Sequence, residues 1–154
     1  MTIQLLLAFS TFAFVMSVTP GPNNMMLLAS GVNFGLRRSV PHLLGISLGL
    51  MLMVCAMGFG LGQVLKLYPP LFNLLRYVGG AYLLYLSWRI ATAAAPQVDG
   101  AADAKPFGLL QAAAFQWVNP KAWIMAVAAI TTYAPAQPLW HQVLLIAGLF
   151  ALIN

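Results

Sequence analysis

Long apolar runs separated by short polar interruptions dominate the chain. Five runs can be delimited, at about residues 3–32, 41–65, 71–91, 107–133 and 139–154. Transmembrane β-strands would alternate apolar and polar positions, whereas these runs are continuous. A helix needs about 20 residues to cross a hydrocarbon core about 30 Å thick. The pattern therefore predicts an all-α, polytopic membrane protein with four full spans and a partial fifth.

The composition agrees with this pattern. Hydrophobic residues make up 62% of the 154 residues and charged residues 6%, against about 45–50% and about 25% in soluble domains. Seven basic and two acidic residues cannot cover a water-facing surface. These values exclude a cytosolic globular enzyme and a disordered chain. With Cys55 as the single cysteine, they also exclude a disulfide scaffold.

The basic residues predict the orientation in the membrane. Arg37, Arg38, Arg89 and Lys105 follow the first and third runs, whereas Lys66 and Arg76 flank the loop after the second. The positive-inside rule then places the first and third loops in the cytoplasm and the N-terminus outside. This sorting accounts for most of the net charge of +5, so no nucleic-acid partner is expected.

A polar segment interrupts the first apolar run. It consists of Thr19, Pro20, Gly21, Pro22, Asn23 and Asn24. The prolines remove backbone donors and the glycine lets the chain unwind. About seven apolar residues on each side make only about 10 Å of helix, so neither half spans a bilayer alone. We expect this break to lie inside the membrane.

A second break, Val118–Ala122, interrupts the fourth run and contains Asn119, Pro120 and Lys121. If the span began after Lys121, only about 18 Å of helix would remain. Lys121 is therefore expected at depth; a lysine anchored at the interface with a snorkelling stem is the alternative. Gln116, one turn earlier, faces either the same cavity or the helix bundle.

The two breaks suggest an inverted repeat. Pro20 and Pro120 lie 120 − 20 = 100 positions apart, and three spans separate equivalent points, so the second half would be inserted upside down. The predicted division is a three-helix repeat over 1–92, a cytoplasmic linker over 93–106 and an incomplete second repeat over 107–154. Matched broken helices in inverted repeats indicate the binding site of a secondary transporter.

The small residues of the second run indicate close helix packing. Gly45 and Gly49 are four residues apart, and Gly58, Gly60 and Gly62 follow at intervals of two. Small residues at such spacings let membrane helices approach closely.

At these residues the chain resembles the LysE/RhtB family of amino-acid exporters. The resemblance rests on Thr19-Pro20-Gly21-Pro22-Asn23, Gly35 with Arg37, Gly45 with Gly49, Gly79 to Leu83, and Asn119-Pro120-Lys121-Ala122, in this order along the chain. It implies a six-span protein of the bacterial inner membrane that exports neutral amino acids or their derivatives, driven by proton exchange. The chain departs from the family by stopping within the fifth span, as a truncated member would, and at Ile130–Tyr133, where many members have Pro-Gln-Phe.

The two breaks are expected to meet near the midplane and form one substrate site. Lys121 would bind the substrate carboxylate, helped by half-helix N-termini, and the amide side chains would bind its other polar groups. The candidate substrate-binding residues are Thr19, Pro20, Gly21, Pro22, Asn23, Asn24, Gln116, Asn119, Pro120 and Lys121. Alternating access would be a rocking of one repeat against the other. A homo-oligomer is left open.

The proton carrier is not evident from the sequence. Asp99 and Asp103 both lie in the predicted linker, so no predicted span contains an acid. His42 and His141 lie at ends of runs, where interfacial positions are expected. Lys121 itself, or a carboxylate beyond Asn154, are the remaining candidates.

Two other function classes are compatible with parts of the pattern. A structural or accessory membrane subunit, or an inactive fragment of a transporter, would carry the breaks only as packing kinks. A membrane enzyme is disfavoured because HExxH, GxSxG and paired carboxylates are absent from the sequence. No catalytic residue, metal or cofactor is predicted; the expected partners are an amino acid and the lipid bilayer.

Overall fold

A computed structural model describes residues 1–68, 106–135 and 138–154, with isolated positions between 70 and 88. This described part is helical and contains no strand, which confirms the predicted all-α class. The predicted third span (71–91) and linker (93–106) lie largely outside the described residues.

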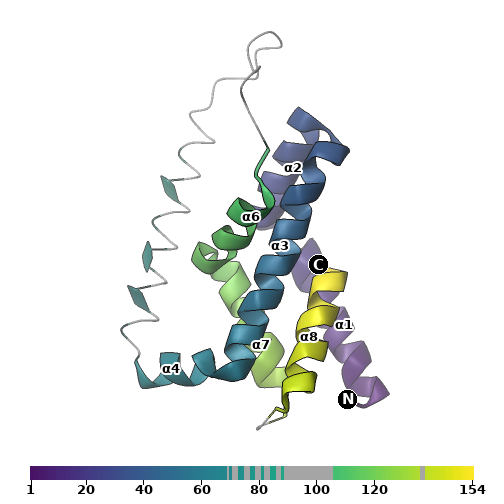
Figure 1. Ribbon diagram of the computed structural model, residues 1–154, viewed down its shortest axis with the longest axis vertical. Helices are drawn as coiled ribbons and strands as arrows, with labels where there is room; N and C mark the ends of the chain where they lie inside the picture. Colours follow the sequence, from purple (N-terminus) through teal and green to yellow (C-terminus); the bar gives the residue numbers. More distant parts are fainter. Residues whose placement is uncertain are drawn as a thin grey trace.

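The first apolar run folds as two helices, α1 (Ile3–Val18) and α2 (Pro22–Phe34), bent by 58° at the break between them (Figure 1). The Thr2 hydroxyl begins α1 by accepting the Leu5 N–H at 3.3 Å. The helix ends at Thr19 because a residue before a proline is confined to extended conformations. With 16 and 13 residues, the two helices are about 24 Å and about 20 Å long, so neither crosses a bilayer alone.

The second run forms a helix over Leu36–Val64, made of α3 (Leu36–Ala56), η1 (Met57–Leu61) and the start of α4 (Gly62–Leu67). Among the described residues, it is the one helix that is long and apolar enough to span a membrane, and the bent α1–α2 pair passes the same test together. Pro41 lies inside α3 rather than at its start. At Gly60, with φ of 123°, the chain adopts a conformation that favours glycine, and α4 turns away from the bundle (Figure 1).

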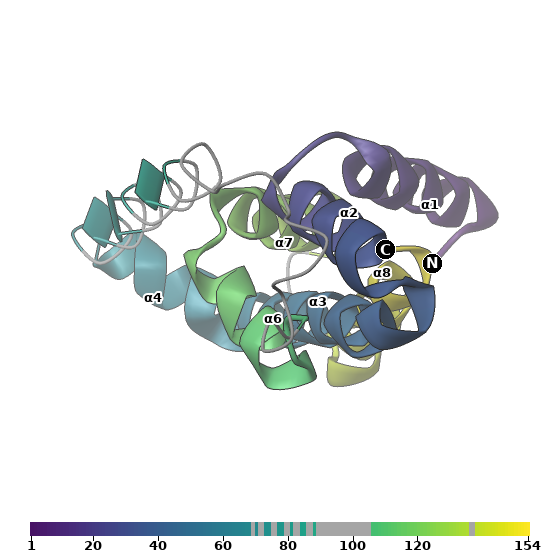
Figure 2. The ribbon, with the colours of Figure 1, turned by 90° about the horizontal axis from the view of Figure 1, so that it is seen from above.

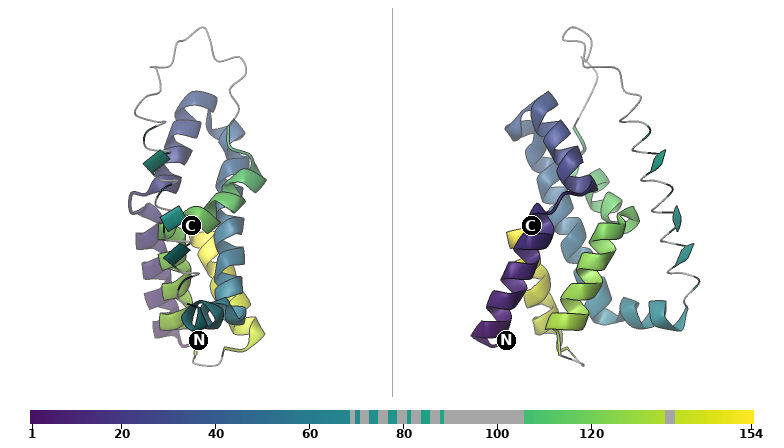
Figure 3. Two further views of the ribbon diagram at one scale, coloured as in Figure 1. Left: turned by 90° about the vertical axis from the view of Figure 1, so that its left-hand side faces the viewer. Right: turned by 180° about the vertical axis from the view of Figure 1, so that it is seen from behind.

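The second half begins with α6 (Leu109–Phe115), η2 (Gln116–Val118), α7 (Pro120–Tyr133) and α8 (Trp140–Ile153). Seen from the side, α6 and α7 follow one another in the direction opposite to that of α1 and α2 (Figures 1 and 3). The chain therefore passes its two breaks in opposite directions.

Helix α3 lies at the centre, with α2, α6 and α8 packed around it (Figure 2). Gly45 and Gly49 permit the closest approach. A Cβ atom at Gly45 would overlap the Leu109 carbonyl, and one at Gly49 would lie 2.7 Å from the Ala113 Cα and from the Gln116 Cγ. Both glycines are buried on the face toward α6, which agrees with their packing interpretation.

The apolar core continues between α1, α7 and α8. Phe9 is fully buried there. Its ring meets Phe150 edge-on at 5.6 Å and Tyr133 edge-on at 5.2 Å, arrangements that aromatic pairs favour. These contacts join the first half of the chain to the second, between the N-terminal end of α1 and the first break.

Replacing Gly49 by valine should destabilise the fold by about 1–3 kcal/mol, because the added methyl groups would force α6 away from α3. Thermal unfolding in detergent measures the effect. Gly31→Ala is the matched control, since a Cβ atom at Gly31 meets nothing within 4 Å. Equal unfolding temperatures for the two variants would contradict the close α3–α6 packing.

Candidate functional site

The first break leaves carbonyl groups of α1 without helical partners, and side chains of α2 bind them. Asn24 Nδ2 donates to the carbonyls of Ser17 (2.9 Å) and Thr19 (3.2 Å). Helix α2 restarts at Pro22, whose fixed φ and missing N–H suit the first position of a helix. Gly21 precedes it and provides no side-chain cap. The break is thus a defined turn, with Asn23 and Asn24 already inside α2.

The second break has a similar construction with different residues. Asn119 begins α7: its Oδ1 accepts the Lys121 N–H at 3.1 Å, and Pro120 again occupies the first helical position. The Trp123 indole N–H donates to the freed carbonyl of Trp117 at 2.9 Å. The Asn119 side chain is 1% exposed, so it is a buried helix cap.

The two breaks are in direct contact. The Lys121 ammonium donates to the Thr19 carbonyl, across 102 residues of sequence. The lysine side chain passes over Gly21, where a Cβ atom would lie 2.8 Å from Lys121 Cδ and 3.2 Å from Nζ. The glycine therefore makes room for the lysine, and the ammonium of one break satisfies a carbonyl of the other.

A reciprocal amide pair joins the breaks a second time. Asn23 Nδ2 donates to Gln116 Oε1 at 2.8 Å, and Gln116 Nε2 donates back to Asn23 Oδ1 at 3.1 Å. Gln116 is fully buried and also donates to the Ala112 carbonyl at 2.9 Å. Of the two positions open to Gln116 from the sequence, the structure has the one that faces the first break.

The amide pair lies level with the middle of the longest described helix. Gln116 packs against Gly49, which is close to the midpoint of the helix over Leu36–Val64. A helix of 29 residues is about 43 Å long, so its midpoint is about 20 Å from either end. Polar side chains thus gather about midway along a helix that is long and apolar enough to span a membrane.

The electrostatics of the site suit a molecule that carries one negative and one positive group. Helices α2 and α7 both begin here, and the N-terminus of a helix attracts anions. The first turn of α2 has no side-chain cap, and Lys121 adds a positive charge beside it. The C-terminal carbonyls of α1, at Ser17 and Thr19, can accept hydrogen bonds from a cation. Among the described residues, no cluster of His, Cys, Asp or Glu could hold a metal ion.

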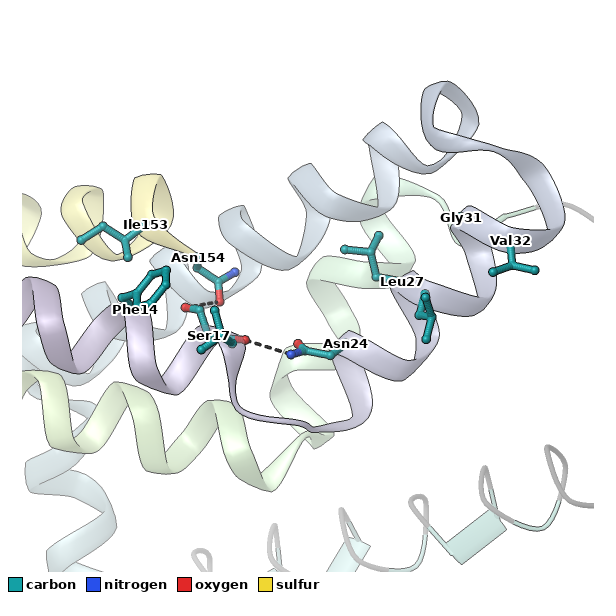
Figure 4. Close-up of a pocket in the computed structure, with 10 residues that line it drawn as sticks. Phe14, Ser17, Asn24, Leu27, Gly31, Val32, Ile153 and Asn154 are labelled. Atoms are coloured by element: carbon teal, nitrogen blue, oxygen red, sulfur yellow. Dashed lines mark hydrogen bonds between the residues drawn. The ribbon is translucent and has the colours of Figure 1, made fainter.

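A pocket of about 560 Å³ adjoins the first break, between α1, α2 and the end of α8 (Figure 4). Ser17, Asn24 and Asn154 supply its polar groups, and apolar side chains, mainly of α1 and α2, line most of it. The end of α8 closes one side, where Ser17 Oγ donates to Asn154 Oδ1 at 3.2 Å. Asn24 therefore stands between the pocket and the carbonyls of the break.

The structure brings most of the predicted site residues together, in differing roles. Thr19, Gly21 and Lys121 meet in one contact, and Asn23 and Gln116 in another. Asn24 binds the break, and Asn119, Pro22 and Pro120 begin helices. Pro20 is exposed and only shapes the turn. Sequence reasoning missed Ser17, Trp117 and Trp123; an indole N–H three residues after a proline break was the available signal for Trp123.

Two broken helices that run in opposite directions and join polar side chains inside an apolar helical bundle define a membrane transporter. The family model of the LysE type translocator matches residues 14–153, so the chain belongs to this family.

Relatives in two bacteria extend this result. The cysteine/O-acetylserine efflux protein of Salmonella typhimurium strain LT2 is 36% identical over 158 residues, which cover 100% of this chain and 78% of that protein. The protein of the same name in Escherichia coli strain K12 is 36% identical over 140 residues, or 89% of this chain and 69% of that protein. No solved structure matches the chain.

Family membership confirms several predictions from the sequence. The resemblance to LysE-type exporters is correct, and the function class is amino-acid efflux. The chain is a transporter and not an enzyme, and it is a membrane protein with a small amino-acid substrate.

Removing either amide of the reciprocal pair should cost about 1–3 kcal/mol of stability, because the other amide is left partly unpaired in an apolar surrounding. A double-mutant cycle with Asn23→Ala and Gln116→Ala tests this. Unfolding in detergent should give a loss for the double variant that falls short of the summed single losses by about 1 kcal/mol.

The control for this cycle is Asn33→Ala. Asn33 is exposed and donates only to the Ala29 carbonyl of its own helix, at 2.8 Å. Combined with Gln116→Ala, it should give additive losses. Additivity in the Asn23 cycle as well would show that the amide pair contributes no coupling.

Proposed function

We propose that this chain exports small neutral amino acids, such as cysteine and O-acetylserine, by exchange with protons across the bacterial inner membrane. One observation carries the proposal: the Lys121 ammonium lies on the Thr19 carbonyl, beside the uncapped N-terminus of α2. The names of the relatives supply the substrate class.

In this proposal the substrate replaces contacts that the two breaks make with each other. An amino acid is a zwitterion. Its carboxylate would bind Lys121 and the free N–H groups at the start of α2, where charge and helix dipole both favour an anion. Its ammonium would take the place of the Lys121 ammonium on the Thr19 carbonyl. The zwitterion is neutral overall, so no net charge enters the site. Each of its two charged groups would find a partner that is already present.

The pocket beside the first break would hold the substrate side chain. Ser17 and Asn24 offer a hydroxyl and an amide there, within a lining that is otherwise mostly apolar. Such a lining suits a short uncharged side chain with one polar atom. A basic or acidic side chain would find no partner of opposite charge among the described lining residues, so neutral substrates are favoured.

The proposed architecture is the inverted repeat, with units over 1–92 and 107–154 joined by a linker over 93–106. Its support is the opposite course of α1–α2 and α6–α7 (Figure 1) and the proline that begins the second helix of each pair. These helix starts pair Pro22 with Pro120, 120 − 22 = 98 positions apart, in place of Pro20. Rocking of one repeat against the other would break and remake the Asn23–Gln116 pair, which bridges them.

The proposed topology places the N-terminus outside and the corner between α2 and α3 in the cytoplasm. Arg37 and Arg38 are exposed at that corner, at the end of the bundle away from the N-terminus (Figure 1). Exposed apolar side chains, among them Leu7 (62%) and Leu152 (85%), would face lipid or further copies of the chain.

Lys121→Met should lower export at least about tenfold, since a hydrogen bond to a charged group is worth about 1.5–3 kcal/mol. Efflux of labelled O-acetylserine from cells that express equal amounts of each variant measures the effect. Thr11→Ala, which removes an exposed hydroxyl bonded only within α1, is the control and should export normally. Export by Lys121→Met at the wild-type rate, with normal membrane insertion, would refute the proposed site.

Gly21→Ala tests the same site without removing a charge. The new methyl group would overlap Lys121 Cδ, and because the lysine side chain is flexible it should move rather than unfold the protein. We expect a higher KM for export with an unchanged unfolding temperature. An unchanged KM would show that the position of the lysine over Gly21 does not matter for binding.

A further inference from the structure

A second group of buried polar side chains lies away from the helix breaks, at the corner between α2 and α3. Ser30, Ser39 and His42 are only 5%, 3% and 2% exposed. The two serine hydroxyls share a hydrogen bond of 2.8 Å. The His42 ring packs against Phe107 at 5.5 Å, and its Nδ1 is buried with no hydrogen-bond partner in the described part of the chain. Buried polar atoms of this kind are rare and call for an explanation.

His42 lies at one end of the seam between α3 and α6. His42, Gly45 and Gly49 follow at intervals of three and four residues, so they share one face of α3. The two glycines meet the backbone of α6 directly, and Gly49 also meets Gln116. From His42 to Gly49 is about 10 Å along the helix. The seam therefore leads from the buried imidazole to the Asn23–Gln116 pair.

The surroundings fit a neutral imidazole and oppose a charged one. Neither α2, nor α6, nor residues 106–108 contain a titratable side chain. On α3 itself, Arg38 lies one turn before His42 and is exposed; Lys121 lies beyond the other end of the seam. Both are positive. Among the residues that the structure describes, a protonated ring would thus be a buried charge without an anionic partner. Separation of α6 from α3 would relieve it by admitting water.

We propose that His42 is the proton-carrying group of the transport cycle. The neutral ring accepts at Nδ1 a proton from water that enters the substrate site from the outer side, by way of the seam that leads to the Asn23–Gln116 pair. The resulting imidazolium favours opening of the α3–α6 seam toward the cytoplasmic side. Once the seam is open, Nδ1 returns the proton to water on the side of Arg37 and Arg38, and the neutral ring lets the seam close. Histidine suits this task because its charge changes within the physiological pH range. The inference rests on the proton exchange of the proposed function.

Reconstitution separates coupling from transport. Proteoliposomes that contain the wild type or His42→Gln are tested for exchange of labelled O-acetylserine without a gradient, and for accumulation driven by a gradient of one pH unit with the membrane potential clamped at zero. For one proton per substrate, the wild type should accumulate about tenfold. His42→Gln should exchange at a rate similar to the wild type and accumulate nothing. His141→Gln, which alters the exposed histidine on α8, is the control and should behave as the wild type.

Each other outcome is decisive. Accumulation by His42→Gln to the wild-type level would overturn the role of His42 and leave the proposed export intact. A wild type that exchanges substrate but ignores the pH gradient would overturn proton exchange, and the role of His42 with it. Loss of both exchange and accumulation in a folded His42→Gln would overturn the coupling role and show a role in transport itself.

A measurement on the native imidazole covers the case in which His42→Gln fails to fold. The chain contains two histidines, so in His141→Gln the imidazole of His42 is the single group that diethyl pyrocarbonate converts to an N-carbethoxyimidazole, which its ultraviolet absorbance identifies. We expect modification to be severalfold faster when O-acetylserine is added, because cycling opens the seam. A modification rate that substrate leaves unchanged would overturn the proposal.

Discussion

Backbone groups that lose their helical partners in an apolar surrounding must find other partners, and this requirement governs how the two breaks are arranged. The carbonyls of Ser17 and Thr19 receive the Asn24 amide, and Thr19 also receives the Lys121 ammonium. Trp123 serves the carbonyl of Trp117 in the same way. Part of the pairing of the first break thus comes from the second, through Lys121 and through Gln116. These contacts hold the two halves of the chain together at the breaks.

The same pairing of polar groups is compatible with the proposed binding of substrate at this site. In the substrate-free structure the polar groups satisfy each other, which keeps the interior stable without a ligand. In the proposed mechanism, a zwitterionic substrate would exchange one set of partners for another of similar strength. Binding of this kind yields a modest net free energy, since each hydrogen bond to the substrate replaces one within the protein. A carrier that must release its cargo on every cycle benefits from that balance.

Much of this arrangement could be predicted from the sequence, and the limits have physical causes. Proline and glycine act on their own neighbours, so the breaks near Pro22 and Pro120 could be located from local chemistry alone. The contact of Lys121 with Thr19 and the pairing of Asn23 with Gln116 join residues about a hundred positions apart, which apolar periodicity does not encode. The sequence predicts an interfacial His42 because this residue lies at the end of a run. Its burial depends on Phe107 and α6, which arrive from the other half of the chain.

The Asn23–Gln116 pair is uncharged, and this has a consequence for the response to membrane voltage. Moving one elementary charge through the full potential changes the free energy by about 2.3 kcal/mol per 100 mV. Breaking an amide–amide pair moves no net charge, so the proposed opening of this bridge would be equally favourable in energised and de-energised cells. Any voltage dependence of transport must then arise from the few groups that carry charge through the field. In the proposed exchange the resting potential acts on the proton that is transported, whereas the Asn23–Gln116 pair does not respond to it.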